Sequence, residues 1–527
     1  MYGKEKIREL FKKWQGGGPG GQVYVAHKGE LVFGECFGYA DIEHNELIGE
    51  NTVFHVASVS KQITAMCVLI LHERGLMDIN NDIREYIRDL VAFSEPVTVK
   101  DLMNNISGIR DQWNLQVLSG VRLCDHITQG DLLELMGRQK SLNFPPRTQY
   151  MYSNGNFTLL AEIVERVSGV SLAKFANKNI FLKLDMKNTF FREKYDHLVP
   201  NRAMSYVDSW DGTYLWRPLS YSNYGATSLH TTGLDFLKWM KNLRNPVVCS
   251  EETLKTMLEV PKLDSDEKTT YACGINVSVR DDLGGRTVIF HGGADAGYRA
   301  MMFSVPEEQI DIAIFANVEN LNVDALASKI SEILLGIKND VTIPEFDEKY
   351  YQDEVKNIDS LLGDYVYDTD VPVSLVKEGD VVRMLTGDNK RPKVTYLKGN
   401  CFEIENAPYK LYVNVDEMIL STGSASVRLG KMAAAVFSDD DLSQAPGIYF
   451  SPEVDSHFEL QNIDGALFMR HKRLGKAPLM PVGDDIYSCR LEFPLRMSFV
   501  KNEGGDIISI KIMSGRITGI LFHRILI

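Results

Sequence analysis

Two hydrophobic patterns divide the 527-residue chain into regions. One is the alternation of apolar and polar residues that is typical of strands, and the other is the spacing of apolar residues that is typical of helices. Up to about residue 338 both patterns occur. In the segment QVYVAHKGELVFGECFG, apolar and polar residues alternate on both sides of Lys28-Gly29, which predicts a two-stranded hairpin. Apolar positions at helical spacing predict helices over 58–74, 131–138, 157–168 and 324–336, and short apolar runs predict strands over 286–291, 298–305 and 310–316.

Strands at both ends of this region enclose the helices. This order predicts an α+β fold, in which one antiparallel sheet is assembled from the two ends and the helices pack on it. The polar stretch 341–357, interrupted by Pro344, is predicted to be a linker.

Beyond the linker the pattern changes to short alternating segments with Gly and Asp at the turns, which is typical of antiparallel sandwiches or barrels. The motif Gly-x-Tyr at 363–365 recurs at 447–449, 84 residues later. This spacing predicts two small β-barrels of similar length. The predicted domains are therefore 1–340, 358–440 and 441–527.

Composition limits the classes of partner. Apolar residues make up 44% and charged residues 24% of the chain, as in soluble globular proteins. The net charge of −14, spread along the chain, argues against nucleic acid or an anionic membrane as a partner. A homo-oligomer stays open at this point.

The cysteines and histidines predict neither a disulfide framework nor a metal site. The seven cysteines are odd in number and form no C-x-x-C pair, and the eleven histidines include no H-E-x-x-H. No glycine-rich phosphate loop follows a strand, so no cofactor is expected. The segment MYGKEKIRELFKKW predicts a charged amphipathic helix without a signal core, which favours a cytoplasmic protein, or an exported one if a cleaved signal segment precedes it.

The first candidate motif is Ser58-Val59-Ser60-Lys61, at the start of a helix that is apolar nearly all round. Residues three apart share a helix face, so the Ser58 hydroxyl and the Lys61 amine can meet. Burial disfavours a charged ammonium, which would let Lys61 act as a base near neutral pH. A helix N-terminus also favours developing negative charge at Ser58.

Ser-x-x-Lys alone is a weak signal, because it occurs five times here. Ser374 and Ser498 fall in the strand-rich region, where positions i and i+3 point to opposite faces. Ser265 lies in a polar loop, and Ser171 fits an N-cap. Only Ser58 opens a buried helix.

Two further motifs follow in order. Tyr152-Ser153-Asn154 lies just before the predicted helix 157–168, where Tyr152 could shuttle a proton and Asn154 could donate to a substrate carbonyl and to Lys61. The same tripeptide begins at Tyr221, so it is ambiguous alone. His291-Gly292-Gly293 ends the predicted strand RTVIF, and its glycines would let a substrate backbone approach the strand edge.

These motifs, in this order, resemble the serine β-lactamase and penicillin-binding-protein superfamily, and most closely its D-aminopeptidase, esterase and class C branch. That branch carries Ser-x-x-Lys, Tyr-x-Asn and then Lys-Thr-Gly or His-x-Gly. The resemblance favours Tyr152 over Tyr221, since Tyr152 directly precedes the helix that follows this motif in the family. Resembling stretches span most of residues 18–305 and include TVFHVASVSKQITAM, LNFPPRTQYMYSNGNFTLLAEIVERVSGVSLAKFANKNIF and GATSLHTTGLDFLKW.

The resemblance implies a role for each motif residue. Ser58 would be the nucleophile, with Lys61 and Tyr152 as base and proton shuttle, the choice between them left open. Asn154 would orient the substrate, and His291, as a cationic or hydrogen-bonding residue, would meet its far end next to Gly293. The backbone N–H groups of Ser58 and Ala294 would form the oxyanion hole. It also implies a catalytic domain followed by two lipocalin-like barrels.

The resulting hypothesis is a cofactor-free serine hydrolase acting through an acyl-enzyme on a small peptide, amide or ester. D-amino-acid amides or peptides rank first, small esters second and β-lactams last, because histidine replaces the lysine that suits a penicillin carboxylate. The alternative of another class is a penicillin-binding fold kept as a non-catalytic binding or regulatory module. The joint presence of Ser58 and Lys61 argues against that alternative.

Overall fold

A computed structural model gives the structure of the chain. It describes residues 2–89, 96–122, 124–209, 213–337, 358–366, 373–385, 392–398, 400–405, 410–414, 416–421, 426–432, 437–483, 485–491 and 493–525. The chain divides into two compact units, Met1–Trp113 with Leu123–Asn339, and Asn114–Arg122 with Asp340–Ile527. The predicted linker 341–357 lies outside the described residues.

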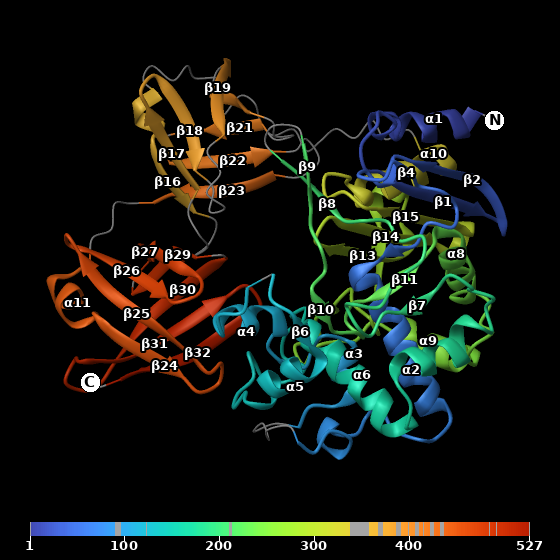
Figure 1. The fold of residues 1–527 in the computed structure, drawn as a ribbon, viewed down its shortest axis with the longest axis horizontal. Coiled ribbons are helices and arrows are strands. Elements are labelled where there is room, and N and C mark those ends of the chain that lie inside the picture. The colour runs from blue at the N-terminus through green and yellow to red at the C-terminus, as the bar shows by residue number, and fades with distance from the viewer. Residues whose placement is uncertain are drawn as a thin grey trace. The chain divides into compact units, whose positions relative to one another are not determined.

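The first unit is built on a six-stranded antiparallel sheet (Figure 1). Strand β1 pairs with β15 from Gly21 opposite Ala316 to His27 opposite Ile310, so the two ends of this region share the sheet, as predicted. Lys28 and Gly29, both with positive φ, form the predicted hairpin turn between β1 and β2. The strand order is β12 (Asn276–Arg280), β13 (Arg286–Asp295), β14 (Tyr298–Val305), β15 (Ile310–Ala316), β1 (Gly21–His27) and β2 (Glu30–Phe37).

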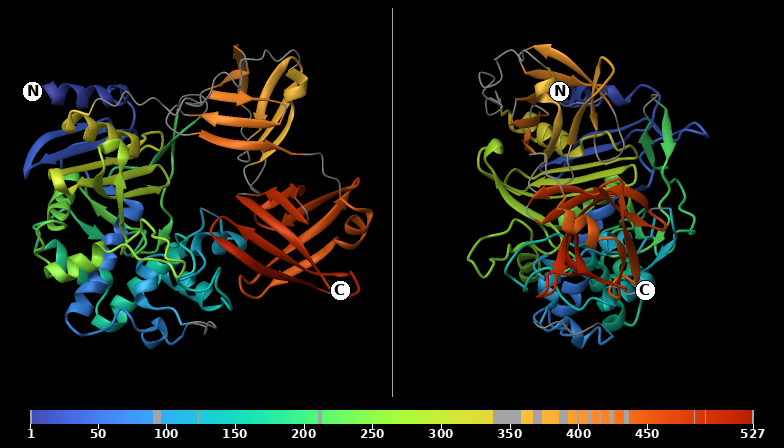
Figure 2. Two further views of the ribbon diagram at one scale, coloured as in Figure 1. Left: turned by 180° about the vertical axis from the view of Figure 1, so that it is seen from behind. Right: turned by 90° about the vertical axis from the view of Figure 1, so that its left-hand side faces the viewer.

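Helices cover both faces of this sheet, which Figure 2 shows from behind. On one face α1 (Tyr2–Leu10) and α10 (Val323–Leu335) share a core with Val23 and Val25 of β1. The intervening Tyr24 points to the other face, where α8 (Gly233–Asn242) approaches so closely that a side chain on Gly233 would strike the Tyr24 ring. The period-2 alternation of a strand explains this division.

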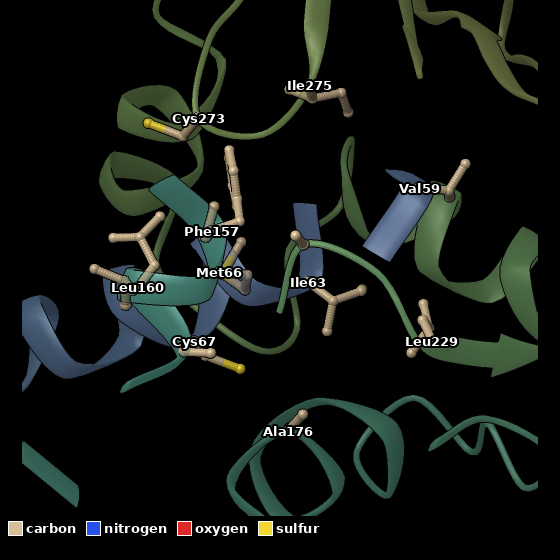
Figure 3. Packing of buried hydrophobic residues seen from close by; sticks show 14 of the residues in the cluster. Val59, Ile63, Met66, Cys67, Phe157, Leu160, Ala176, Leu229, Cys273 and Ile275 are labelled. Atoms are coloured by element: carbon tan, nitrogen blue, oxygen red, sulfur yellow. The ribbon is translucent and has the colours of Figure 1, made fainter. Parts of the chain in front are cut away.

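The remaining helices surround α2 (Lys61–Glu73), which is buried along nearly its whole length. Its side chains pack against α6 (Asn154–Ser168), for example Met66 near Phe157 and Leu160 (Figure 3). The predicted helix over 58–74 is thus present, but its first turn, Ala57–Ser60, is a 3-10 turn. The other helices of this unit are α3 (Val99–Met103), α5 (Gln129–Gly137), α7 (Leu172–Ala176) and α9 (Glu251–Leu258), while α4 (Gln112–Leu118) belongs to the second unit from Asn114 on.

Short strands connect these helices to the sheet. The three-stranded sheet β5-β11-β7 brings His55 opposite His230, and β10 pairs with β6 in parallel. The bounds are β3 (Tyr39–Asp41), β4 (Glu46–Leu47), β5 (Phe54–His55), β6 (Ile127–Thr128), β7 (Phe190–Phe191), β8 (Tyr206–Asp208), β9 (Tyr214–Trp216), β10 (Tyr221–Ser222) and β11 (Leu229–Thr231).

The second unit contains a closed eight-stranded antiparallel barrel, β16 to β23 in sequence order, with β16 pairing back to β23. Closure of an up-and-down sheet removes its free edges. The strands are β16 (Gly363–Val366), β17 (Val373–Glu378), β18 (Val381–Leu385), β19 (Lys393–Lys398), β20 (Cys401–Ile404), β21 (Lys410–Val413), β22 (Glu417–Ser421) and β23 (Ser426–Lys431).

A second, nearly closed barrel follows α11 (Asp439–Gln444). Its nine strands run in the order β27-β26-β25-β24-β32-β31-β30-β29-β28, and β27 also contacts β29 across the seam. The strands are β24 (Gly447–Ser451), β25 (Ser456–Ile463), β26 (Ala466–His471), β27 (Gly475–Pro478), β28 (Met480–Gly483), β29 (Ile486–Arg490), β30 (Pro494–Lys501), β31 (Ile507–Ser514) and β32 (Ile517–Arg524).

The repeated Gly-x-Tyr motif occupies the first strand of each barrel. The Tyr365 hydroxyl donates to the carbonyl of Leu361 over 2.7 Å, and the Tyr449 hydroxyl donates to the carbonyl of Ala445 over 2.8 Å. Both rings are fully buried. The motif thus makes the same local contact in both barrels, while the boundaries 358–440 and 441–527 stay predictions.

Within the described part of the chain, every helix is too short or too polar to cross a lipid bilayer.

Candidate active site

Ser58 lies on a strained turn in front of α2. The preceding Ala57 has φ of +47°, a left-handed conformation that is uncommon for a residue with a side chain. Ser60 holds this turn, since its hydroxyl donates to the carbonyl of Ala57 over 2.5 Å and accepts from the backbone N–H of Leu229 over 3.0 Å. Ser58 itself stays partly exposed. The turn therefore presents the Ser58 side chain at the surface of a buried core.

Lys61 is the first residue of α2 and is completely buried. Its Nζ atom lies 3.0 Å from Ser58 Oγ, 2.8 Å from Asn154 Oδ1 and 2.7 Å from the carbonyl oxygen of Ala226. Gly274 makes this burial possible, because a side chain there would come within 2.7 Å of the Lys61 carbonyl oxygen. An ammonium at Lys61 donates to all three acceptors, whereas the deprotonated amine would keep its two N–H bonds to Asn154 and Ala226 and turn its lone pair to Ser58.

Asn154 begins α6, and a carboxylate fixes its amide. The backbone N–H and the Nδ2 group of Asn154 donate to Asp111 Oδ2 over 2.7 and 2.8 Å. This arrangement assigns Oδ1 as the atom that accepts from Lys61. The sequence-based expectation that Asn154 donates to Lys61 is wrong, since the hydrogen bond runs the other way. One Nδ2 hydrogen is left for a substrate carbonyl.

Tyr152 packs beside these residues at the edge of the core. Lys61 Nζ lies over the Tyr152 ring, 4.9 Å from its centroid, and the ring meets Tyr271 edge-on at 5.8 Å. Tyr152 is therefore next to Lys61, as expected. The choice between Lys61 and Tyr152 as the base for Ser58 stays open.

His291 lies in the middle of β13, which continues to Asp295 instead of ending at the predicted residue 291. Its Nδ1 atom contacts the carbonyl oxygen of Gly292 at 2.6 Å and its Nε2 atom contacts the Tyr271 hydroxyl at 3.0 Å. A carbonyl only accepts, so Nδ1 carries the proton and Nε2 accepts from Tyr271. Burial, and then the nearby Lys61, lower the pKa of His291 to about 3. His291 is thus neutral near pH 7, which leaves hydrogen bonding as its chemistry.

Gly293 allows β13 to pass directly against the turn that carries Ser58. A side chain at position 293 would lie 2.2 Å from the carbonyl oxygen of Val56, whereas one at Gly292 would make ordinary contacts with Met301 Cε at 3.5 Å and the Ala300 carbonyl oxygen at 3.9 Å. The close approach expected between Gly293 and a substrate is thus, in the structure, an approach between two segments of the chain itself. Glycine is required at 293 for that reason.

The N–H of Ala294 points to the outer edge of β13. Asp295 pairs with Tyr298 around a two-residue turn, and such a closing pair exchanges hydrogen bonds. In an antiparallel ladder the neighbouring residue, Ala294, then directs its N–H away from β14. On that outer edge β12 pairs only as far as Phe290. Ala294 is exposed, so its N–H can meet a molecule bound along this edge.

Sequence reasoning missed two partners of the site, Asp111 and the Ala226 carbonyl. A carboxylate two residues after the ISGI segment could have drawn attention to Asp111. The Ala226 carbonyl is a backbone group, so the type of side chain at this position does not point to its role. Ser171 is the N-cap of α7, as predicted, with its hydroxyl accepting from Lys174 N.

The second Tyr-Ser-Asn motif has other roles. The Asn223 amide donates to Gln129 and Thr158 and accepts from Gln112, all within the buried interior. Among the described residues, the one cluster of potential metal ligands is Asp41, Glu43 and His44, on a turn where Glu43 and His44 are exposed. That no metal takes part stays a prediction.

Several known proteins are similar to this chain in sequence or in structure. A D-aminopeptidase from Brucella anthropi is 24% identical over 527 residues, an alignment that covers 96% of each chain. A D-aminopeptidase from Brucella ovis is 29% identical over 326 residues, which are 61% of this chain and 60% of the relative. The solved structure of an octameric penicillin-binding protein homologue from Pyrococcus abyssi shares the fold, with a TM-score of 0.57, 21% identity and coverage of 81% of this chain and 98% of that one.

The family model described as Beta-lactamase matches residues 5–335, which contain all three motifs and the sheet that carries them. A match over more than half of the chain shows that this protein belongs to the beta-lactamase family.

Proposed function

We propose that the protein is a serine hydrolase that cleaves a peptide or amide bond through an acyl-enzyme on Ser58, as a D-aminopeptidase or D-amino-acid amidase does. The observation that carries this proposal is the 3.0 Å contact between Ser58 Oγ and the buried Lys61 Nζ. The curated relatives named above are D-aminopeptidases, which supports the same class of substrate.

In the first step Lys61, directly or through Tyr152, takes the proton of Ser58 as Oγ attacks the substrate carbonyl. Burial favours the neutral amine that this step requires. The oxyanion accepts from the N–H groups of Ser58 and Ala294, each typically worth about 3–4 kcal/mol of transition-state stabilisation. The C–N bond then breaks, the leaving amine takes the proton, and water releases the acyl group from Ser58.

The neutral state of His291 supports the ranking of substrates. A cation at this position would stabilise a substrate carboxylate, and a neutral imidazole cannot do so. The hydrolase is therefore suited to substrates without a carboxylate at that end, such as amino-acid amides. Small esters rank second and β-lactams last.

Labelling with a reactive fluorophosphonate, followed by intact-protein mass spectrometry, tests the nucleophile. One adduct on the wild type, mapped to the Ser58 peptide and absent from Ser58→Ala, is the expected result. Hydrolysis of D- and L-alanine p-nitroanilide and of p-nitrophenyl acetate then separates amidase from esterase. Equal labelling of both proteins, or undiminished turnover by Ser58→Ala, would refute the mechanism and favour a non-catalytic module.

A further inference from the structure

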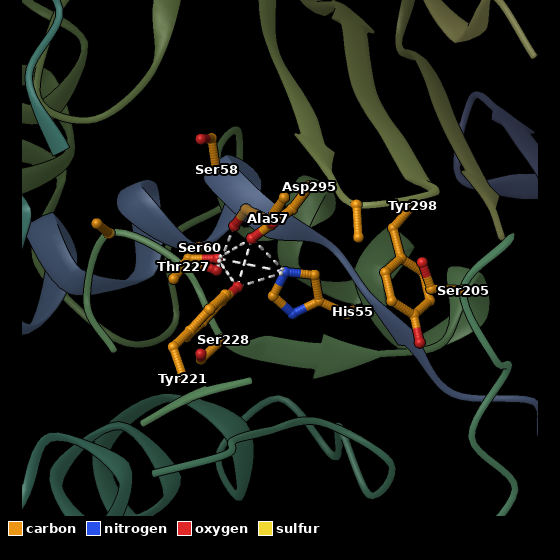
Figure 4. A network of polar contacts seen from close by, with 12 residues as sticks. His55, Ala57, Ser58, Ser60, Ser205, Tyr221, Thr227, Ser228, Asp295 and Tyr298 are labelled. Atoms are coloured by element: carbon orange, nitrogen blue, oxygen red, sulfur yellow. Dashed lines mark hydrogen bonds and ion pairs between the residues drawn. The ribbon is translucent and has the colours of Figure 1, made fainter. Parts of the chain in front are cut away.

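A partly buried polar cluster lies behind the turn that carries Ser58 (Figure 4). Its centre is Asp295 Oδ2, which accepts from the Tyr221 hydroxyl, from Thr227 Oγ1 over 3.3 Å and from His55 Nε2 over 3.3 Å. Tyr221 begins the second Tyr-Ser-Asn motif, for which the proposed reaction has no use. In Figure 4 the Ser58 side chain points away from this cluster.

The cluster joins three segments that each supply a part of the proposed site. His55 lies three residues before Ser58, and Thr227 follows Ala226, whose carbonyl accepts from Lys61. Asp295 directly follows Ala294 on β13. β13 also packs closely on the Ser58 turn at Gly293, opposite the carbonyl of Val56.

The Asp295 carboxylate is the common acceptor of the hydrogen bonds in this cluster. Burial raises the pKa of Tyr221 well above its ordinary value, and the Asp295 charge raises it further, so its hydroxyl stays a donor. Burial alone would raise the pKa of Asp295, but the hydrogen bonds from His55, Tyr221 and Thr227 outweigh it and lower that pKa. His55 Nδ1 is buried without a hydrogen-bond partner, so the ring meets the cluster through Nε2, which donates because a carboxylate only accepts. Asp295 is therefore an anion held by three donors.

We propose that Asp295 is a positioning residue that fixes the spacing between the backbone N–H groups of Ser58 and Ala294. This inference rests on the proposed function, because it assigns those two groups to the oxyanion hole. An oxyanion hole acts only when both donors are held at the geometry of the transition state. Ser60 holds the strained turn from within, and Asp295 links that turn, through His55, to the residue that follows Ala294.

The sharpest test is Tyr221→Phe, which removes one hydroxyl and keeps the ring. We expect kcat to fall roughly 10- to 100-fold with little change in KM, because misplacing a catalytic group by about 1 Å can cost roughly 100-fold. The affinity for a boronic acid, whose tetrahedral adduct on Ser58 places an oxygen in the oxyanion hole, should fall by a similar factor. Asp295→Asn keeps an acceptor oxygen and should lose less activity than Asp295→Ala.

Tyr298→Phe is the matched control. It removes the buried hydroxyl of a tyrosine on β14, and this hydroxyl donates to the Ala203 carbonyl and not to the Asp295 carboxylate. Both tyrosine variants should lower the melting temperature, but only Tyr221→Phe should lower kcat and boronate affinity. Equal kcat and equal boronate affinity in the two variants would overturn the positioning role. A wild type that fluorophosphonate does not label would instead refute the proposed function itself.

Discussion

Lys61 donates a 2.8 Å hydrogen bond to Asn154, an amide that Asp111 holds in a single orientation. Asp111, Asn154, Lys61 and Ser58 therefore form a series of hydrogen bonds that runs from the buried carboxylate of Asp111 to the partly exposed hydroxyl of Ser58. Each member limits how the next can turn, so the geometry at Ser58 depends on a carboxylate that does not contact it directly.

Replacing Asp111 by Asn should lower kcat/KM by roughly 10- to 100-fold, because the Asn154 amide can then rotate and misplace Lys61. The measurement is steady-state hydrolysis of an amide substrate, together with the rate of fluorophosphonate labelling. Asp235→Asn is the control, since Asp235 is also buried and accepts from Asn188 N and Thr189 Oγ1. Asp111→Asn and Asp235→Asn with equal kcat/KM would contradict the orienting role.

Gly293→Ala should inactivate the protein more than any other single methyl addition on β13. The new methyl group would lie 2.2 Å from the Val56 carbonyl oxygen, so either the strand or the Ser58 turn must move. We expect at least a 100-fold loss in kcat/KM and a destabilisation of about 1–3 kcal/mol. The methyl group of Gly292→Ala would make only van der Waals contacts, with the flexible end of Met301 at 3.5 Å and the Ala300 carbonyl oxygen at 3.9 Å, so this variant should keep most activity. The comparison requires kinetics and thermal unfolding of both variants, and the reverse order would contradict it.

His291 should make the catalytic unit sensitive to acid. Its folded pKa is about 3, against an ordinary value of 6.5, so between these values the unfolded chain binds a proton that the folded one does not. The stabilisation is thus complete above pH 6.5 and is lost as the pH falls toward 3. Between pH 7 and 4.5 the wild-type melting temperature should fall roughly 5 °C more than that of His291→Gln. Parallel curves for the two proteins would show that His291 titrates normally.

Benzylpenicillin should be hydrolysed poorly, because neutral His291 cannot balance its carboxylate. The expected kcat/KM is at least 100-fold below that for a D-amino-acid amide, a difference of about 2.7 kcal/mol in transition-state binding. Steady-state hydrolysis of both compounds by the same preparation provides the measurement, with Ser58→Ala as the background. Efficient turnover of benzylpenicillin would reverse the ranking of substrates.

Local patterns predicted the sheet well. The runs over 298–305 and 310–316 coincide with β14 and β15, because strands buried on both faces are unbroken apolar segments between turns. The hairpin at Lys28-Gly29 is similarly local. The strand through His291 was predicted too short, since Gly292 and Gly293 carry no strand propensity. Their pairing with Met301 and Ala300 of β14 continues the strand, and the close contact of Gly293 with Val56 explains the glycine at 293.

The candidate site was predictable where one helix turn or one motif supplies both partners. Ser58 and Lys61 meet through the i, i+3 spacing, and Tyr152 packs beside Lys61. The direction of the Asn154–Lys61 hydrogen bond was not predictable, because it depends on Asp111 from another loop. The role of Tyr221 was likewise hidden, since its partner Asp295 comes from a strand 74 residues later. Hydrogen bonds between residues far apart in the sequence produce no periodic pattern of residue types.

The matching tyrosines of the two barrels bear on how this long chain folds. Tyr365 and Tyr449 each bond a carbonyl only four residues upstream, so this contact on the first strand of each barrel requires no distant strand. Closing so short a loop costs little chain entropy. Neighbouring domains of similar structure run the risk of exchanging strands as they fold. A local contact on each first strand, together with the different sequences of the two barrels, favours the pairing of strands within the same barrel during synthesis.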